Sequence, residues 1–137
     1  MRQSTLITSI FCSFFSALAL AADPAALLDS YAAQARQQEP NFTGFSGERG
    51  KALYFREELR DGKNMSCTTC HGQDPLQPGK TLTFRKIEPL APSITPARFT
   101  DAKKVEKWFR RNCNDVFGRE CSAQEKGDFV SWISNLK

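Results

Sequence analysis

The chain of 137 residues has very little histidine and methionine: His71 is the only histidine, and Met1 and Met65 are the only methionines. Metal sites that use two or more histidines are therefore excluded, and so is acid–base chemistry that relies on a second histidine. The histidine and methionine side chains that could bind a metal ion are thus few, so each can be weighed singly.

Long hydrophobic runs are also lacking, apart from one at the amino terminus. Arg2 precedes a largely apolar segment from residue 6 to 20, and Ala19-Leu20-Ala21 fits a small-residue cleavage site. These features are typical of a secretory signal peptide, because the apolar segment is short for a membrane span of about 20 residues. We expect residues 1–21 to be a cleaved signal peptide and residues 22–137 to form one domain, not inserted in a membrane, in the periplasm of a Gram-negative bacterium.

No strong excess of charge of either sign is present. The formal net charge is +4, and removal of Arg2 with the signal peptide leaves 18 basic against 15 acidic residues, a net charge of +3. Such a mild balance gives no indication of nucleic-acid binding. Five basic residues are grouped in what we name the basic strip: Lys103, Lys104, Lys107, Arg110 and Arg111. The strip is either a solvated helix face or a docking surface for an acidic partner.

The most informative pattern is Cys67-Thr68-Thr69-Cys70-His71, which has the C-x-x-C-H spacing of covalent haem c attachment. Two thiols at this spacing can add to the two vinyl groups of one porphyrin, and the following histidine is then held against the iron. We therefore predict one covalently bound haem c, attached at Cys67 and Cys70, with His71 as the proximal iron ligand.

Two other interpretations of C-x-x-C are disfavoured by the rest of the chain. A zinc site would need a second pair of ligands, but Cys113 and Cys121 are separated by seven intervening residues and no further histidine exists. A redox-active dithiol of the thioredoxin type belongs to a βαβ pattern, whereas the flanks here indicate helix and proline-rich loop.

The five cysteines are accounted for once the signal peptide is set aside. Cys12 lies inside the apolar segment that we expect to be removed, and Cys67 and Cys70 are assigned to haem. Cys113 and Cys121 remain, and we expect them to form a disulfide in an oxidising compartment.

The remaining pattern is helical, with weak strand signals. A first amphipathic helix is predicted from Pro24 to the break before Pro40, and a second from about residue 46 to 60 with Asp61-Gly62 as its stop. Prolines at positions 75, 78, 89, 92 and 96 then favour a loop that can wrap a flat cofactor. Thr100 is expected to be the N-cap of a helix to about Arg111, and a capping box, Ser122 with Glu125, begins a final helix.

A helix before a haem motif, a wrapping loop and a closing carboxy-terminal helix are typical of class I cytochromes c. We therefore predict an all-α, class I cytochrome c fold around one covalently attached haem, with an additional N-terminal helix. Gly50, with the aromatic residues near it and in the final helix, suits a close crossing of two helices. Since about 115 residues bury only a small core, the porphyrin should also be a structural element.

The sixth iron ligand is not one of the usual residues. Met1 is lost with the signal peptide, and Met65 lies two residues before Cys67, tethered to the proximal side. With a single histidine, ligation by two histidines is excluded as well. Water, an open position, a lysine, or a neutral amide or phenol side chain remain.

Helical phase singles out Asn112 among the polar side chains. It ends an apolar stripe that consists of Ala102, Val105, Trp108 and Phe109. Asn114 is out of phase with this stripe, and the nearby lysines fall mainly on the other face. From phase alone, Asn112 is either an iron ligand or a helix C-cap.

Several motifs, taken in order, resemble the SHP family of oxygen-binding monohaem cytochromes c. They are Cys67-Thr-Thr-Cys-His71-Gly72, Ile87-Glu-Pro-Leu-Ala-Pro-Ser93, Arg98-Phe-Thr-Asp101, Val105-Glu-Lys-Trp108, Arg111-Asn-Cys-Asn114 and Gly118-Arg-Glu-Cys121. The resemblance runs through nearly the whole chain after residue 21. It implies that His71 is the fifth ligand, that Asn112 is the sixth, and that Cys113 and Cys121 form a disulfide.

The resemblance also implies a function. In that family the asparagine binds ferric iron and leaves on reduction, the iron then takes O2, NO or a similar ligand such as CO, and a dihaem cytochrome c is the electron donor. We therefore expect a monomeric, high-spin-type cytochrome with this behaviour and no dedicated catalytic residue. Turnover of the ligand, as a terminal oxidase or small-molecule reductase, is left open. The alternative is a simple electron-transfer cytochrome whose iron stays six-coordinate in both redox states.

Overall fold

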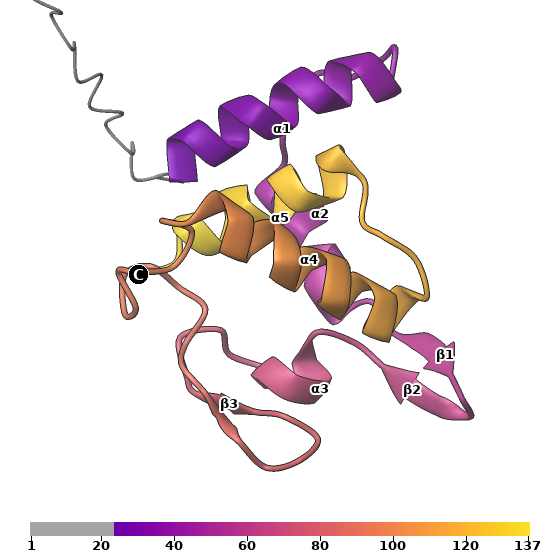
Figure 1. The fold of residues 1–137 in the computed structure, drawn as a ribbon, viewed down its shortest axis with the longest axis vertical. Coiled ribbons are helices and arrows are strands. Elements are labelled where there is room, and N and C mark those ends of the chain that lie inside the picture. The colour runs from indigo at the N-terminus through magenta and orange to yellow at the C-terminus, as the bar shows by residue number, and fades with distance from the viewer. Residues whose placement is uncertain (1–23) are drawn as a thin grey trace, which may run out of the picture.

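The computed structural model describes residues 24–137, and the predicted signal peptide lies outside the described residues. The helices in this part are α1 (Pro24–Gln38), α2 (Gly47–Phe55), α3 (Thr68–His71), α4 (Ala102–Phe117) and α5 (Ala123–Ser134) (Figure 1). Four short strands form two antiparallel pairs: β1 (Glu58–Arg60) with β2 (Lys63–Met65), and β3 (Gly79–Lys80) with β4 (Lys86–Ile87). None of the helices between residues 24 and 137 is long and apolar enough to span a bilayer.

Helices α2 and α5 cross at very close range, as the sequence predicts. A Cβ atom at Gly50 would lie 2.1 Å from the carbonyl oxygen of Asp128, so only glycine fits there. Beside this point the ring of Tyr54 packs against Trp132 with 5.2 Å between centroids. The crossing fixes α2, which leads toward the C-x-x-C-H motif, against the last helix of the chain.

A buried carboxylate locks the start of α2 to α5. Asp128 accepts two hydrogen bonds from the Arg49 guanidinium, at 2.7 and 2.9 Å, and one of 2.6 Å from the backbone N–H of Ser46. Ser46 is itself the N-cap of α2. Because a buried charge is expensive unless it is paired, this arrangement holds the two helices in one register.

The additional N-terminal helix, α1, is attached to both α4 and α5. Tyr31 of α1 donates a hydrogen bond of 2.5 Å to Glu106 of α4, and Lys126 of α5 donates one of 2.7 Å to the other oxygen of the same carboxylate. The Tyr31 ring also meets Phe109 of α4 edge to face. One acidic side chain therefore joins three helices.

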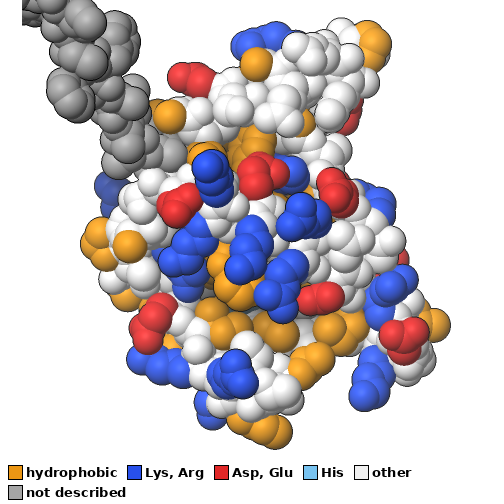
Figure 2. All heavy atoms as spheres, viewed as in Figure 1, with side chains coloured by type: hydrophobic (Ala, Val, Ile, Leu, Met, Phe, Trp, Pro, Cys, Tyr) orange, Lys and Arg blue, Asp and Glu red, His pale blue; other side chains and the backbone are white. Residues whose placement is uncertain are grey.

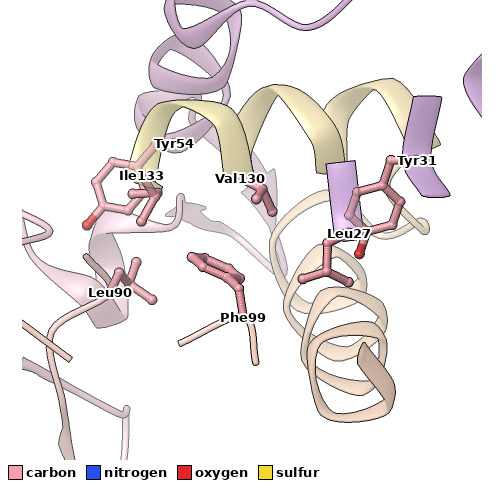
Figure 3. Packing of buried hydrophobic residues seen from close by; sticks show 7 residues of the cluster. All are labelled: Leu27, Tyr31, Tyr54, Leu90, Phe99, Val130 and Ile133. Atoms are coloured by element: carbon pink, nitrogen blue, oxygen red, sulfur yellow. The ribbon is translucent and has the colours of Figure 1, made fainter. Parts of the chain in front are cut away.

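The core combines residues from helices and from the proline-rich segment. Figure 3 shows Val130 and Ile133 of α5 above Leu90 and Phe99, which reach the core from the segment between α3 and α4. Phe99 has a φ of 63°, so its backbone turns sharply to aim the ring inward. The proline-rich segment thus packs its apolar side chains under α5, although it contains only short strands.

The predicted end of the second helix is wrong. The helix expected to run to residue 60 ends at Phe55, and residues 58–65 form the β1–β2 hairpin instead. Asp61 and Gly62 both have positive φ, 49° and 76°, as the two central residues of a type I′ turn do. The Asp-Gly pair was therefore a hairpin signal and not a helix stop.

Helix α4 also differs from the sequence prediction at both ends. Its N-cap is Asp101, whose side chain accepts a hydrogen bond of 3.0 Å from the backbone N–H of Lys104, and not Thr100. The helix continues past Arg111 to Phe117 and ends at Gly118, which adopts the left-handed conformation typical of a C-cap. The predicted capping box of α5, Ser122 with Glu125, is confirmed.

Candidate functional site

Helix α3 is one helical turn that carries the chemistry of the C-x-x-C-H motif. Cys67 and Cys70 are free thiols, and burial raises the pKa of Cys67 to about 11. Burial, together with the positive charge of Arg98, lowers the pKa of His71 to about 4. The imidazole is therefore neutral at pH 7 and offers a ring nitrogen lone pair. This set of two protonated thiols and one neutral imidazole fits covalent attachment of a porphyrin and ligation of its iron.

The backbone of the C-x-x-C-H motif is held in place by close packing against β3 and α2. A Cβ atom at Gly79 of β3 would lie 2.1 Å from the carbonyl oxygen of Cys70. On another side, the buried Tyr54 donates a hydrogen bond of 2.6 Å to the carbonyl oxygen of Gly72, the residue after His71. The proximal segment is thus fixed by a strand and by α2.

Arg98 holds the proline-rich segment near His71. Its Nε donates a hydrogen bond of 2.9 Å to the carbonyl oxygen of Pro89, and its terminal nitrogen donates another to the carbonyl oxygen of Glu88. Burial lowers the pKa of the Arg98 guanidinium, which stays charged at any physiological pH. A cation is therefore built into the loop on the proximal side.

Asn112 lies inside α4, well before its end at Phe117. The interpretation of Asn112 as a helix C-cap is therefore wrong, since Gly118 has that role. Its half-buried carboxamide makes no hydrogen bond to another residue between 24 and 137, whereas the Asn114 amide donates one of 2.6 Å to the carbonyl oxygen of Arg110. The Asn112 side chain is thus free to serve as a ligand.

Asp115, close to Asn112 on α4, is near enough to the cysteine motif to act on it electrostatically. Burial raises the pKa of the Cys70 thiol, and the negative charge of Asp115 raises it further. Asp115 follows Asn112 by three residues, so the two side chains lie on neighbouring parts of one helix side. The charge of Asp115 thus links this part of α4 to α3, which begins after its N-cap Cys67 and contains Cys70 and His71.

The predicted disulfide between Cys113 and Cys121 is confirmed, with 5.7 Å between the two Cα atoms. It joins the last turn and a half of α4 to the segment before α5, and both residues are buried. A Cβ atom at Gly118, in the loop that the disulfide closes, would lie 2.3 Å from the Arg60 guanidinium of β1. The carboxyl end of α4 is therefore fastened directly after Asn112.

Large apolar side chains are exposed around this site. Leu82, whose backbone lies near the Cys70 thiol, is 67% exposed, and Trp108, one turn before Asn112, is 43% exposed. Such surface is unfavourable in water, and a large apolar ligand would cover it. The residues present therefore fit a haem between α3 and α4.

Three features of the site were missed by sequence reasoning: the Tyr54 hydrogen bond, the position of Arg98 and the proximity of Asp115 to Cys70. Each depends on contacts between segments far apart in the chain, so no local pattern marks them. Only Asp115 had a usable signal, because it falls three residues after Asn112 on the same helix.

Comparison with known proteins assigns relatives to the chain. A family model described as a domain of unknown function, DUF1924, matches residues 40–133. The cytochrome c-type protein SHP of Cereibacter sphaeroides is 47% identical over 120 residues, which are 85% of this chain and 88% of that protein.

Solved structures show the same fold. A structure of oxidised SHP, described as an oxygen-binding cytochrome c, matches with a TM-score of 0.76 and 43% identity, and covers 84% of this chain and 98% of that one. The solution structure of cytochrome c'' from Methylophilus methylotrophus, presented with insights into haem-ligand detachment, matches with a TM-score of 0.74 and 34% identity. The match covers 82% of this chain and 93% of that one. The predicted class I cytochrome c fold is confirmed.

Proposed function

Because this chain belongs to the DUF1924 family and is a homologue of the cytochrome c-type protein SHP, we propose that it is a redox-switched binder of small diatomic ligands. On reduction by a partner protein, Asn112 releases the iron, and O2, NO or CO binds at the vacated position. The observation that supports this proposal is the carboxamide of Asn112, which has no hydrogen-bond partner among residues 24–137 and lies in α4 three residues before Asp115, whose charge acts on Cys70.

The proximal residues hold one haem c. Cys67 and Cys70 form its two thioether bonds, and His71 donates a ring nitrogen to the iron. The haem supplies a redox-active iron that binds a small ligand in its ferrous state. The low pKa of His71 keeps the imidazole unprotonated, so no proton competes with the metal at neutral pH.

Asn112 makes ligation depend on the oxidation state. The uncharged amide is a weak donor, which binds ferric iron but holds ferrous iron poorly, whereas a thioether would favour the ferrous state. Adding an electron therefore tips the balance toward release of Asn112. For the same reason the reduction potential should lie below that of methionine-ligated cytochromes.

The decisive experiment compares Asn112→Ala with the wild type by absorption spectroscopy in both redox states, with and without CO. The wild type should show a six-coordinate ferric iron and a ferrous iron that takes up CO. The variant should lack the amide ligand in the ferric state and still take up CO when reduced. Asn114→Ala is the matched control, because Asn114 lies two residues away but hydrogen-bonds within its helix.

The alternative function, simple electron transfer, makes the opposite prediction. A haem iron that stays six-coordinate in both states, with two axial ligands from the protein, would not bind CO readily. If the ferrous wild type fails to take up CO, or if Asn112→Ala has the ferric spectrum of the wild type, the proposal is wrong.

The remaining parts of the proposal concern location and partners. We infer that residues 1–21 direct export to the periplasm, because covalent haem attachment and disulfide formation both take place outside the cytoplasm. The electron donor is a dihaem cytochrome c that docks on the basic strip, where Lys and Arg side chains gather over α4 (Figure 2). The protein acts as a monomer, and turnover of the bound ligand as an oxidase or reductase would be a further step at the same site.

A further inference from the structure

Trp108 is exposed where an apolar stripe predicted that it would be buried. Its side chain is 43% exposed, although it precedes Phe109, which packs in the core against Tyr31 and Phe129. A tryptophan buries a large apolar area when it is covered, so an exposed one near a ligand site requires an explanation.

The position of Trp108 within α4 relates it to Asn112. The two residues are four apart, so they lie one above the other on the same side of the helix. The side of α4 that is buried by protein consists of Cys113 and Val116, with Phe109 half buried. Around the helix, Asn112 lies next to this side and Trp108 lies next to Asn112. Trp108 therefore borders the same open side of α4 that carries the ligand.

Two cations keep the indole at the surface of α4. The Arg111 guanidinium lies 5.2 Å from the centroid of the Trp108 ring, and the Lys107 ammonium lies 5.9 Å from it. Cations at these distances are attracted by the ring quadrupole. The indole thus has partners among the helix's own residues, and its place beside Asn112 does not depend on the haem.

The direction of helical side chains brings Asn112 and Trp108 together. Side chains of an α-helix lean toward the amino terminus, over the residues three and four positions earlier. The Asn112 carboxamide therefore leans toward Trp108, and a released carboxamide that rotates away from the iron stays within reach of the indole.

From this arrangement we propose that Trp108 is the residue that restricts access to the iron position vacated by Asn112. Its large, rigid side chain forms one wall of the distal site and limits both the space for the released carboxamide and the entry of a diatomic ligand. The inference rests on the proposed function, because it assumes that Asn112 leaves the iron on reduction.

The test measures CO association with the ferrous holoprotein after flash photolysis. Trp108→Ala should raise the association rate about tenfold, a change of about 1.4 kcal/mol in the barrier. Trp108→Phe should give a smaller increase, because the phenyl ring keeps part of the wall. Leu59→Ala is the matched control, since Leu59 is an apolar side chain that is 72% exposed on β1. The control rate should equal that of the wild type.

Two further measurements separate this role from general damage to the fold. The ferric spectrum of Trp108→Ala should keep the amide ligation of the wild type, and its melting temperature should stay well above the temperature of the assay. An association rate in Trp108→Ala that equals or falls below the wild-type rate would overturn the inference and leave the proposed function intact. A wild type that takes up no CO would overturn both.

Discussion

The hydroxyl group of Tyr54 donates a hydrogen bond of 2.6 Å to the carbonyl oxygen of Gly72, directly after the predicted iron ligand His71. The phenol is fully buried, so neither partner of this bond can turn to water instead. Its burial also raises the pKa of Tyr54, which keeps the phenol protonated as a donor. One bond therefore fixes the proximal segment to α2.

Removal of this donor should destabilise the protein. Tyr54→Phe keeps the ring and its contacts with Trp132 but leaves the Gly72 carbonyl without a partner. We expect the free energy of unfolding to fall by about 1–3 kcal/mol, the cost of an unsatisfied buried polar group. Denaturant titration of the holoprotein measures this loss. Equal midpoints for variant and wild type would show that the bond has no net effect on stability.

The disulfide should stabilise the fold and also hold Asn112. Closing a loop of about nine residues contributes roughly 2.6 kcal/mol in the chain-entropy model. Replacing both Cys113 and Cys121 by alanine avoids buried hydroxyl groups and should lower the free energy of unfolding by about this amount. Because Cys113 adjoins Asn112, we also expect a weaker ferric amide bond, visible in the absorption spectrum. Unchanged ferric ligation and unchanged release on reduction would contradict the second expectation.

Acid should weaken the junction of α1, α4 and α5. Burial would raise the pKa of Glu106, but hydrogen bonds from Lys126 and Tyr31 outweigh it and hold the pKa below the usual 4.5. A carboxyl group with a lowered folded-state pKa contributes stability that is full above pH 4.5 and is lost as the pH falls toward the folded-state value. The stability difference between wild type and Glu106→Gln should therefore shrink on acidification.

The exposed Glu120→Gln is the matched control for that comparison. Its stability should follow that of the wild type throughout the titration. A constant difference between wild type and Glu106→Gln at all pH values would exclude the proposed role of the Glu106 charge.

The basic strip should accelerate reduction by an acidic donor. Charge complementarity raises the encounter rate more than the affinity, and salt screens it. We expect the rate of reduction by a dihaem cytochrome c to fall as ionic strength rises. The double change Lys103→Glu with Arg110→Glu should lower the rate at low salt, whereas Lys51→Glu with Lys80→Glu, on α2 and β3, should not. A rate insensitive to salt would argue against steering by the strip.

The sequence predicted those features of the site that depend on short spacings. The cysteines and His71 occupy one turn, so their proximity follows from the chain itself, whereas Asn112 lies within α4 because this helix continues beyond its predicted end at Arg111. Ligation by His71 and Asn112 stays a prediction.

Features that depend on tertiary contacts could not be predicted from local sequence patterns. Trp108 shares the phase of the core stripe yet is exposed, because the buried side of α4 is centred on Cys113 and Val116. The β1–β2 hairpin was missed because Asp61-Gly62 can end a helix as well as turn a hairpin, and only the pairing of Glu58 with Met65 distinguishes the two.

The close contact at Gly50 limits which helices can move when the protein is reduced. At that residue α2 and α5 meet backbone to backbone, so the pair can neither slide nor tilt without a collision. Helix α4 instead meets its helical neighbours through side chains such as Phe109. We therefore expect a rearrangement that frees the iron to take place in α4, while α2 and α5 keep their positions relative to each other.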